Sequence, residues 1–168
     1  MVKALLLAEV EISRRVVELV ESSFRGLLKL DVSRVDLGEV KMKAFDKARG
    51  QIRADLLLDL LKPAGGWRRY AYVVDGDGYV PGLNFVFGVA YGDKAIVFTE
   101  RLKSTEELFE VRLAKEVIHE LGHTLGLGHC DDPRCVMYFS NTIRDTDRKG
   151  PGFCDRCFER LRRAASGI

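Results

Sequence analysis

The sequence predicts a mixed α/β (α+β) fold in which a partly parallel β-sheet carries packed helices. The first observation is that short apolar runs of strand length alternate with segments whose apolar residues recur at helical spacing. The second is that 168 residues, with 46% hydrophobic and 31% charged side chains, suit one domain with a sizeable core. We therefore expect residues 1–168 to form a single domain.

The first half of the chain predicts strand, helix, strand and helix in that order. Residues 3–10 form a nearly continuous apolar run typical of a buried strand, and residues 27–35 alternate like a second strand. Residues 11–25 carry apolar side chains at helical spacing, and Gly26 is placed to end that helix. Residues 51–62 indicate a second helix. This order favours a partly parallel sheet.

The middle of the chain predicts three further strands. They cover residues 70–74, 84–91 and 95–99, and a tight turn joins the last two. Residues 75–78 resemble the start of a calcium-binding loop, but position 79, a tyrosine, is not the oxygen ligand that such a loop needs. A turn is the better interpretation of this run.

A long helix is predicted over residues 108–125, where apolar side chains again recur at helical spacing. Ser104 and Glu107 form a capping-box pattern at its start. The last quarter of the chain is rich in loop signals and poor in strand signals. We therefore expect an N-terminal subdomain, residues 1–127, and a small irregular C-terminal subdomain, residues 128–168.

Composition and charge argue against several classes of protein. No apolar run approaches the roughly 20 residues that a membrane span needs. The first apolar stretch is too short for a secretory signal, so we expect a cytoplasmic protein with reduced cysteines. A net charge of +2 gives no strong field for nucleic acid or anionic lipid. We expect a monomer that binds neither nucleic acid nor membrane.

All three histidines lie within one short stretch. His119 and His123 are four residues apart on the predicted helix, so both imidazoles project from one face and can reach a single metal ion. Gly126 lies where the helix would end, and a left-handed glycine there would turn His129 back toward the same ion. Three neutral imidazoles leave a fourth position open, which is typical of catalytic zinc.

This constellation predicts hydrolysis of a peptide or amide bond. Zinc in such a site lowers the pKa of its water to about 7 and polarises a carbonyl. Glu120 lies beside His119, so it can reach that water, act as its general base and then protonate the leaving amine. A lone His-Glu-x-x-His motif occurs by accident on many helices. The third histidine at the expected distance favours zinc over that alternative.

All four cysteines lie in the C-terminal quarter. Cys130 and Cys135 form one pair, Cys154 and Cys157 form another, and 18 residues separate the two pairs. This spacing is typical of a closed structural zinc site with four thiolates. The alternatives are a redox-active Cys154–Cys157 pair and two disulfides.

The adjacency of His129 and Cys130 links the two clusters, because consecutive residues would point at different metal ions. The thiolate site would fix the backbone that delivers the third histidine. It would also fix Met137, which lies two residues after Cys135. Our hypothesis is that the four-cysteine site substitutes for a larger C-terminal core.

The string His119-Glu-Leu-Gly-His-Thr-Leu-Gly-Leu-Gly-His-Cys130, followed by Cys135-Val-Met137 and Cys154-Asp-Arg-Cys157, resembles the archaemetzincin family of zinc metallopeptidases. The match spans about 39 residues and combines a metzincin motif with a four-cysteine site. The resemblance implies a compact zincin-like fold. In that fold a twisted mixed sheet carries two packing helices, an active-site helix and a zinc-stabilised C-terminal subdomain.

The resemblance also implies roles for individual residues. The metal ligands would be His119, His123 and His129 for a catalytic zinc, and Cys130, Cys135, Cys154 and Cys157 for a structural zinc. The expected cofactors are therefore two Zn²⁺ ions per chain, with Glu120 as general base and acid and Met137 as the Met-turn. Residues 83–88 resemble the strand above the cleft of that family. The candidate substrate-binding residues there are Asn84, Phe85, Val86, Phe87 and Gly88.

The leading prediction is a zinc metallopeptidase with a peptide substrate, and the resemblance suggests short peptides and aminopeptidase-type cleavage. An exopeptidase needs a group that holds the free amine, and Asp75, Asp77 and Glu100 are candidates. One alternative is a zinc-loaded peptide-binding protein with little or no turnover. Another is a zinc-stabilised nucleic-acid module that uses the basic residues near Cys157.

Overall fold

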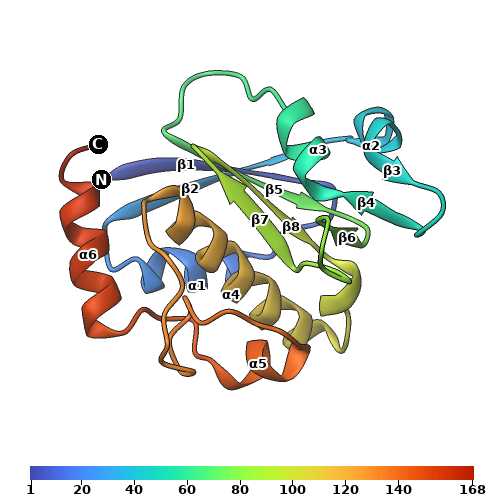
Figure 1. Cartoon of the computed structure of the whole chain (residues 1–168). Helices are drawn as coiled ribbons and strands as arrows, with labels where there is room; N and C mark the ends of the chain where they lie inside the picture. The colour runs from blue at the N-terminus through green and yellow to red at the C-terminus, as the bar shows by residue number, and fades with distance from the viewer.

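A five-stranded sheet crosses the molecule in the computed structural model, which describes residues 1–168 (Figure 1). Its strands in spatial order are β2 (Leu28–Arg34), β1 (Val2–Ala8), β5 (Arg69–Val74), β8 (Lys94–Phe98) and β7 (Gly88–Tyr91). The first four strands are parallel to their neighbours, and β7 runs antiparallel to β8 at the edge. This mixed sheet confirms the predicted fold class.

Helices cover both faces of the sheet (Figure 1). Two of them, α1 (Arg14–Ser23) and α4 (Glu106–Thr124), pack on one face, and α3 (Ala54–Leu60) with α2 (Gly38–Ala44) packs on the other. Alternation along β5 explains the two cores that result. Ala71 and Val73 belong to the core with α1 and α4, whereas Tyr70 and Tyr72 belong to the core with α3.

The C-terminal residues contain two helices that the sequence did not predict. These are α5 (Ile143–Arg148) and α6 (Asp155–Ala165), and α6 lies beside the two chain termini in Figure 1. α6 buries Cys157 and Leu161 in the same apolar core as α1 and α4. Before it, Phe153 packs edge-on against Phe24 with ring centroids 5.1 Å apart. The C-terminal quarter therefore has more regular structure than its loop signals indicated.

A second, three-stranded sheet also escaped prediction. It consists of β3 (Phe45–Asp46), β4 (Gln51–Arg53) and β6 (Gly78–Tyr79). Because β4 pairs with β6, the helix predicted over residues 51–62 begins only at Ala54. The strand predicted over residues 84–91 is similarly shortened and begins at Gly88, and before it Val86 makes a single bridge to Gly78.

The start of α4 differs from the predicted capping box by one residue. A short 3₁₀ turn, η1 (Glu100–Leu102), precedes it, and Thr105 is the N-cap in place of Ser104. The Thr105 hydroxyl accepts a hydrogen bond from the amide of Leu108 at 3.4 Å. No helix in the structure has the length and apolar character required to cross a bilayer.

Candidate active site and cysteine cluster

The three histidines converge at the C-terminal end of α4. The Nε2 atom of His123 lies 3.0 Å from Nε2 of His119 and 3.2 Å from Nε2 of His129. Zinc–nitrogen bonds of 2.0–2.1 Å place tetrahedral ligand nitrogens about 3.3 Å apart, so the observed spacing is close to that of a zinc site. Three imidazoles in this arrangement can hold one metal ion.

Backbone carbonyls orient two of the imidazole rings through their Nδ1 atoms. Nδ1 of His119 lies 2.7 Å from the carbonyl of Val136, and Nδ1 of His123 lies 2.8 Å from the carbonyl of Leu127. An imidazole that donates from Nδ1 keeps the Nε2 lone pair free for a metal. Burial lowers the pKa of His119 and of His123, which favours this neutral form.

The turn after α4 explains how His129 returns to the other two histidines. Gly126 adopts a left-handed conformation with φ +94°. The Leu127 amide donates to the Gly122 carbonyl, and the Gly126 amide donates to the His123 carbonyl, which is the Schellman pattern at a helix end. The prediction that glycine 126 turns the chain is confirmed.

Glu120 lies beneath the edge strand β7 and is only 4% exposed. A Cβ atom on Gly88 would lie 2.8 Å from the Glu120 carboxylate oxygen and 2.5 Å from the Ile96 carbonyl oxygen. Glycine at position 88 is therefore what lets the strand pass so close to the carboxylate. Burial raises the pKa of Glu120 well above its usual range, the nearby Glu116 adds to this, and Lys149 opposes it. A carboxyl group of raised pKa is suited to accept and return a proton.

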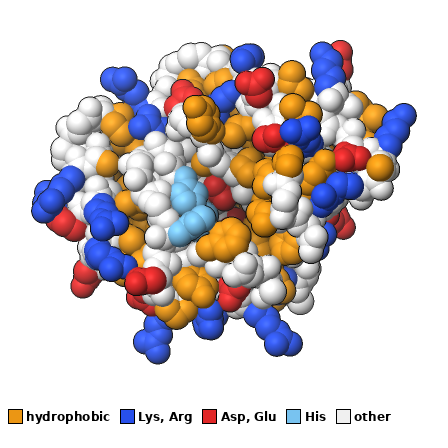
Figure 2. All heavy atoms as spheres, viewed as in Figure 1, with side chains coloured by type: hydrophobic (Ala, Val, Ile, Leu, Met, Phe, Trp, Pro, Cys, Tyr) orange, Lys and Arg blue, Asp and Glu red, His pale blue; other side chains and the backbone are white.

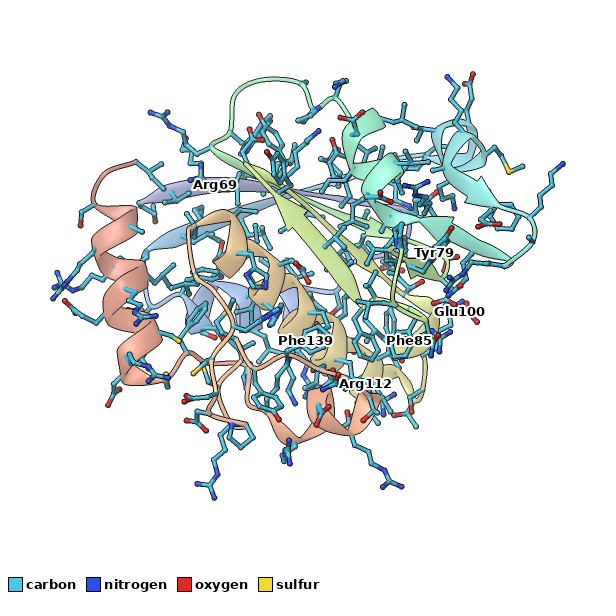
Figure 3. The ribbon with its side chains drawn as sticks, in the orientation of Figure 1. Arg69, Tyr79, Phe85, Glu100, Arg112 and Phe139 are labelled. Carbon is cyan, nitrogen blue, oxygen red and sulfur yellow. The ribbon has the colours of Figure 1, made fainter.

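A cavity of about 200 Å³ opens beside Glu120 and His119. Its lining residues are Leu83, Asn84, Phe85, Val86, Phe87, Gly88, Glu116, His119, Glu120, Phe139, Ser140 and Asn141. In Figure 2 the pale-blue histidines reach the surface beside red acidic atoms and orange hydrophobic side chains. Phe85, from the segment before β7, and Phe139, from the loop before α5, are labelled in Figure 3. All five residues predicted to bind substrate line this cavity.

Three polar residues of the cavity were missed by the sequence reasoning, namely Glu116, Ser140 and Asn141. Glu116 could have been found, because it precedes Glu120 by four residues and therefore shares its helix face. Ser140 and Asn141 carry no comparable sequence signal, since their position depends on how the loop before α5 folds back.

The carboxylates considered as holders of a substrate amine lie elsewhere. Asp75 accepts a hydrogen bond from the Thr99 hydroxyl at 2.7 Å. Asp77 binds the Arg101 guanidinium through both carboxylate oxygens, at 2.8 and 3.0 Å. Asp75, Asp77 and Glu100 line a different cavity, on the side of α2 and β4. The structure does not bring them to Glu120.

The four cysteines also converge, and all of them are free thiols. Their Sγ atoms lie within 4.8 Å of one another, and those of Cys130 and Cys154 are 3.8 Å apart. Zinc–sulfur bonds of 2.3 Å place tetrahedral sulfurs about 3.8 Å apart, so this cluster is also able to hold a metal ion. The Cys154 amide donates to Cys135 Sγ at 3.3 Å, and Arg156 donates to Cys130 Sγ at 3.4 Å.

The chain around Cys130 and Cys135 connects the cysteine cluster to the histidines. The Cys130 amide donates to the Met137 carbonyl at 3.0 Å, and the Val136 amide donates to the Gly152 carbonyl at 3.0 Å. The carbonyl of that same Val136 holds His119. Met137 is fully buried, and a Cβ on Gly122 of α4 would lie 2.6 Å from its sulfur. The two clusters are thus joined through a few residues of backbone.

Three histidines at one helix end, a buried glutamate beside them and an adjoining cavity define the class of zinc-dependent hydrolases. The model of peptidase family M54 matches residues 9–163 of this chain. The chain belongs to peptidase family M54, and it is a zinc metallopeptidase. The resemblance to archaemetzincins that the motifs indicated is confirmed.

Curated relatives and solved structures agree with this assignment. The chain is 54% identical over 121 residues to an archaemetzincin of Pyrobaculum aerophilum, covering 71% of this chain and 76% of that protein. It is 48% identical over 140 residues to an archaemetzincin of Methanopyrus kandleri, covering 76% and 80%. The crystal structure of the Methanopyrus kandleri archaemetzincin matches 98% of this chain and 96% of its own, with TM-score 0.86 and 41% identity.

Proposed function

We propose that this metallopeptidase cleaves short peptides at a catalytic zinc held by His119, His123 and His129, while the four cysteines hold a structural zinc. The observation that carries the proposal is the convergence of three Nε2 atoms next to the buried Glu120 carboxylate and its cavity. The histidine cluster borders a cavity, whereas four sulfurs are enough to close a tetrahedral site. We therefore assign one zinc to catalysis and one to stability.

Each group at this site has a separate role in the proposed hydrolysis. When bound, zinc supplies a Lewis acid that polarises a carbonyl and acidifies water. Glu120 takes the proton from the attacking water and passes it to the leaving amine. Its buried carboxyl group, whose pKa is raised, is suited to both transfers. The carbonyls of Val136 and Leu127 keep two imidazoles neutral and oriented. Met137 supports the histidines from below as a packing group.

The edge strand provides a place for the substrate backbone. β7 pairs with β8 on one side only, so its other side offers free backbone donors and acceptors to an extended peptide. Residues 84–88 then form one wall of the cleft, and Phe139 forms part of the other. A cavity of about 200 Å³ suits a single side chain of the substrate.

Digestion of a peptide library followed by mass spectrometry tests this proposal, with the Glu120→Gln protein as control. We expect the wild-type protein to cut peptides and the Glu120→Gln protein to bind the same zinc while cutting at least about 100-fold more slowly. Trimming from the amino terminus would indicate an aminopeptidase, and internal cuts an endopeptidase. Peptide binding without cleavage by the wild-type protein would contradict the proposal and favour a zinc-loaded peptide-binding protein.

A further inference from the structure

A fully buried lysine lies behind the active site and is not explained by metal binding. The Lys149 side chain is 0% exposed, and its ammonium lies 3.3 Å from the carboxylate of Glu116. The ammonium also donates to the carbonyl of Tyr138 at 3.1 Å. Burial of a charge is costly unless it is paired and hydrogen-bonded, and the Lys149 ammonium meets both conditions.

The group that the pair fixes is the Glu116 carboxylate at the floor of the cavity. One of its oxygens, Oε1, contacts Lys149 and accepts a hydrogen bond from the Thr146 hydroxyl at 3.0 Å. That hydroxyl lies 2.9 Å from the Ser140 hydroxyl, so the network continues along the cavity wall. The second oxygen of Glu116, Oε2, makes no hydrogen bond within the protein. Every fully enclosed side-chain oxygen and nitrogen does have a partner, so Oε2 is not fully enclosed. Glu116 is 2% exposed and lines the cavity, so this second oxygen faces the cavity space.

The charged side chains that line the cavity are both acidic. Glu116 and Glu120 line it, and no lysine or arginine does. Lys149 is enclosed behind Glu116, and Arg101 is held by Asp77 while its guanidinium covers the Phe85 ring at 4.1 Å. A substrate group that reaches the floor therefore meets a carboxylate oxygen with no cation in front of it.

The walls leading to that floor combine apolar side chains with the polar Asn84, Ser140 and Asn141, and hydrogen bonds hold them in place. Leu83, Phe85, Val86, Phe87 and Phe139 supply the apolar surface. On one wall Arg49 donates to the carbonyls of Leu83 and Asn84, at 3.0 and 2.9 Å. On the other, α5 is tied to α4 because Lys115 donates to the Thr146 carbonyl at 3.0 Å. The cavity is thus formed before any substrate arrives.

A passage with five apolar side chains that ends at a carboxylate oxygen free of protein hydrogen bonds suits one kind of side chain. Lysine and arginine bury an apolar stem along such walls and present a cationic donor at the tip. Glu116 lies one helical turn, about 6 Å along the axis, from Glu120, so the tip would sit farther from the histidines than the bond being cut.

Building on the proposed peptidase function, we propose that Glu116 is a specificity-determining residue and that the cavity takes a lysine or arginine side chain of the substrate. Lys149 is then a positioning residue that holds the Glu116 carboxylate with one oxygen toward the substrate. A charge-assisted hydrogen bond at this point raises the rate constant kcat/KM for a basic side chain by about tenfold or more over an uncharged side chain of the same length.

The test uses one peptide frame in which the residue before or after the cleaved bond is lysine, arginine, norleucine or glutamate. Norleucine is the matched control because it keeps the stem of lysine and lacks the ammonium. At one of the two positions we expect the wild-type protein to favour lysine or arginine over norleucine by about tenfold or more in kcat/KM, with glutamate slowest. Equal rates for lysine and norleucine at both positions would overturn the proposal.

Variants then assign the preference to Glu116. In Glu116→Gln the lysine-to-norleucine ratio should fall to within about twofold of one, because a neutral amide no longer pairs with the ammonium. In Glu107→Gln, an exposed glutamate in the first turn of α4, the ratio should stay as in the wild-type protein. A ratio that survives Glu116→Gln would contradict the assignment. If that variant does not fold, the double variant Glu116→Gln/Lys149→Met removes both buried charges together and answers the same question.

Failure of the peptidase proposal would give a different result from failure of this one. If the wild-type protein cleaves no peptide, calorimetry of the lysine and norleucine peptides with the wild-type protein decides the matter. Tighter binding of the lysine peptide would support the assigned pocket even without turnover, and equal binding would overturn it.

Discussion

The histidine cluster and the cysteine cluster lie next to each other in the chain, yet their surroundings differ. The histidines come mainly from a regular helix, α4, and they face a cavity. The cysteines come from loops and from the start of α6, and three of the four are buried. His129 and Cys130 are consecutive residues that belong to different clusters.

This difference indicates which of the two clusters depends on the other for its position. α4, which carries His119 and His123, packs against α1 and against β5, β7 and β8 of the sheet, so these contacts place its backbone. The third histidine, His129, directly precedes Cys130, and the carbonyl that orients His119 belongs to Val136, which directly follows Cys135. We infer that the cysteine cluster supports the histidine cluster, whereas the reverse dependence is weak.

Removal of the cysteine cluster should have the largest effect. In Cys154→Ser/Cys157→Ser we expect loss of both zinc ions and a fall of on the order of 5 kcal/mol in unfolding free energy, because structural zinc binding contributes directly to folding. Zinc analysis and chemical denaturation measure the two effects. Full zinc occupancy at the histidines with unchanged stability would show that the two clusters are independent.

Removal of a histidine should abolish activity and leave the fold intact. In His123→Ala we expect loss of one zinc and a fall of about 1000-fold or more in kcat/KM, since the catalytic ion is gone. The change in unfolding free energy should stay below about 2 kcal/mol, because the remaining site lies in the cysteine cluster. Denaturation at the same zinc concentration is the check, and collapse of this variant would argue that the histidine zinc is also structural.

A change at the strand above Glu120 should reduce activity and spare both metals. The Cβ of Gly88→Ala would collide with the Glu120 carboxylate and with the Ile96 carbonyl, so one of them must move. We expect a fall of about 100-fold in kcat/KM with both zinc ions retained, because a displaced general base no longer reaches its proton. Activity near the wild-type level would contradict the assigned position of Glu120.

The smallest effect is expected between the two clusters, at Gly122. A methyl group there would press on the buried sulfur of Met137, which is flexible but enclosed. Gly122→Ala should lower the unfolding free energy by about 1–3 kcal/mol and reduce activity only several-fold. Thermal denaturation measures the first quantity and peptide hydrolysis the second. No change in either would mean that Met137 does not support the histidines.

The sequence predicted the candidate site residues better than it predicted the short strands and the C-terminal helices. Spacing assigned seven side chains able to bind metal to two groups, because candidate ligands four apart on a helix or paired around turns leave a direct pattern. The strands of the five-stranded sheet followed from apolar runs, and the turn at Gly126 followed from the helix-end rule. The predicted substrate segment, residues 84–88, also reached the cavity.

What could not be predicted depends on contacts between distant residues. β4 and β6 are too short to leave a period in the sequence and exist because residues 51–53 meet residues 78–79. α6 was hidden because its apolar face is narrow among many arginines. The Glu116–Lys149 pair joins residues far apart in the chain, so neither residue alone indicated its partner.

Stepwise removal of zinc from the wild-type protein with EDTA tests the central inference most directly. Zinc per chain, peptide hydrolysis and thermal unfolding are followed together during the titration. We predict two zinc ions at the start: loss of the first abolishes hydrolysis at an unchanged melting temperature, and loss of the second unfolds the protein. Unfolding on loss of the first ion, or hydrolysis that survives it, would contradict a catalytic site supported by a separate structural one.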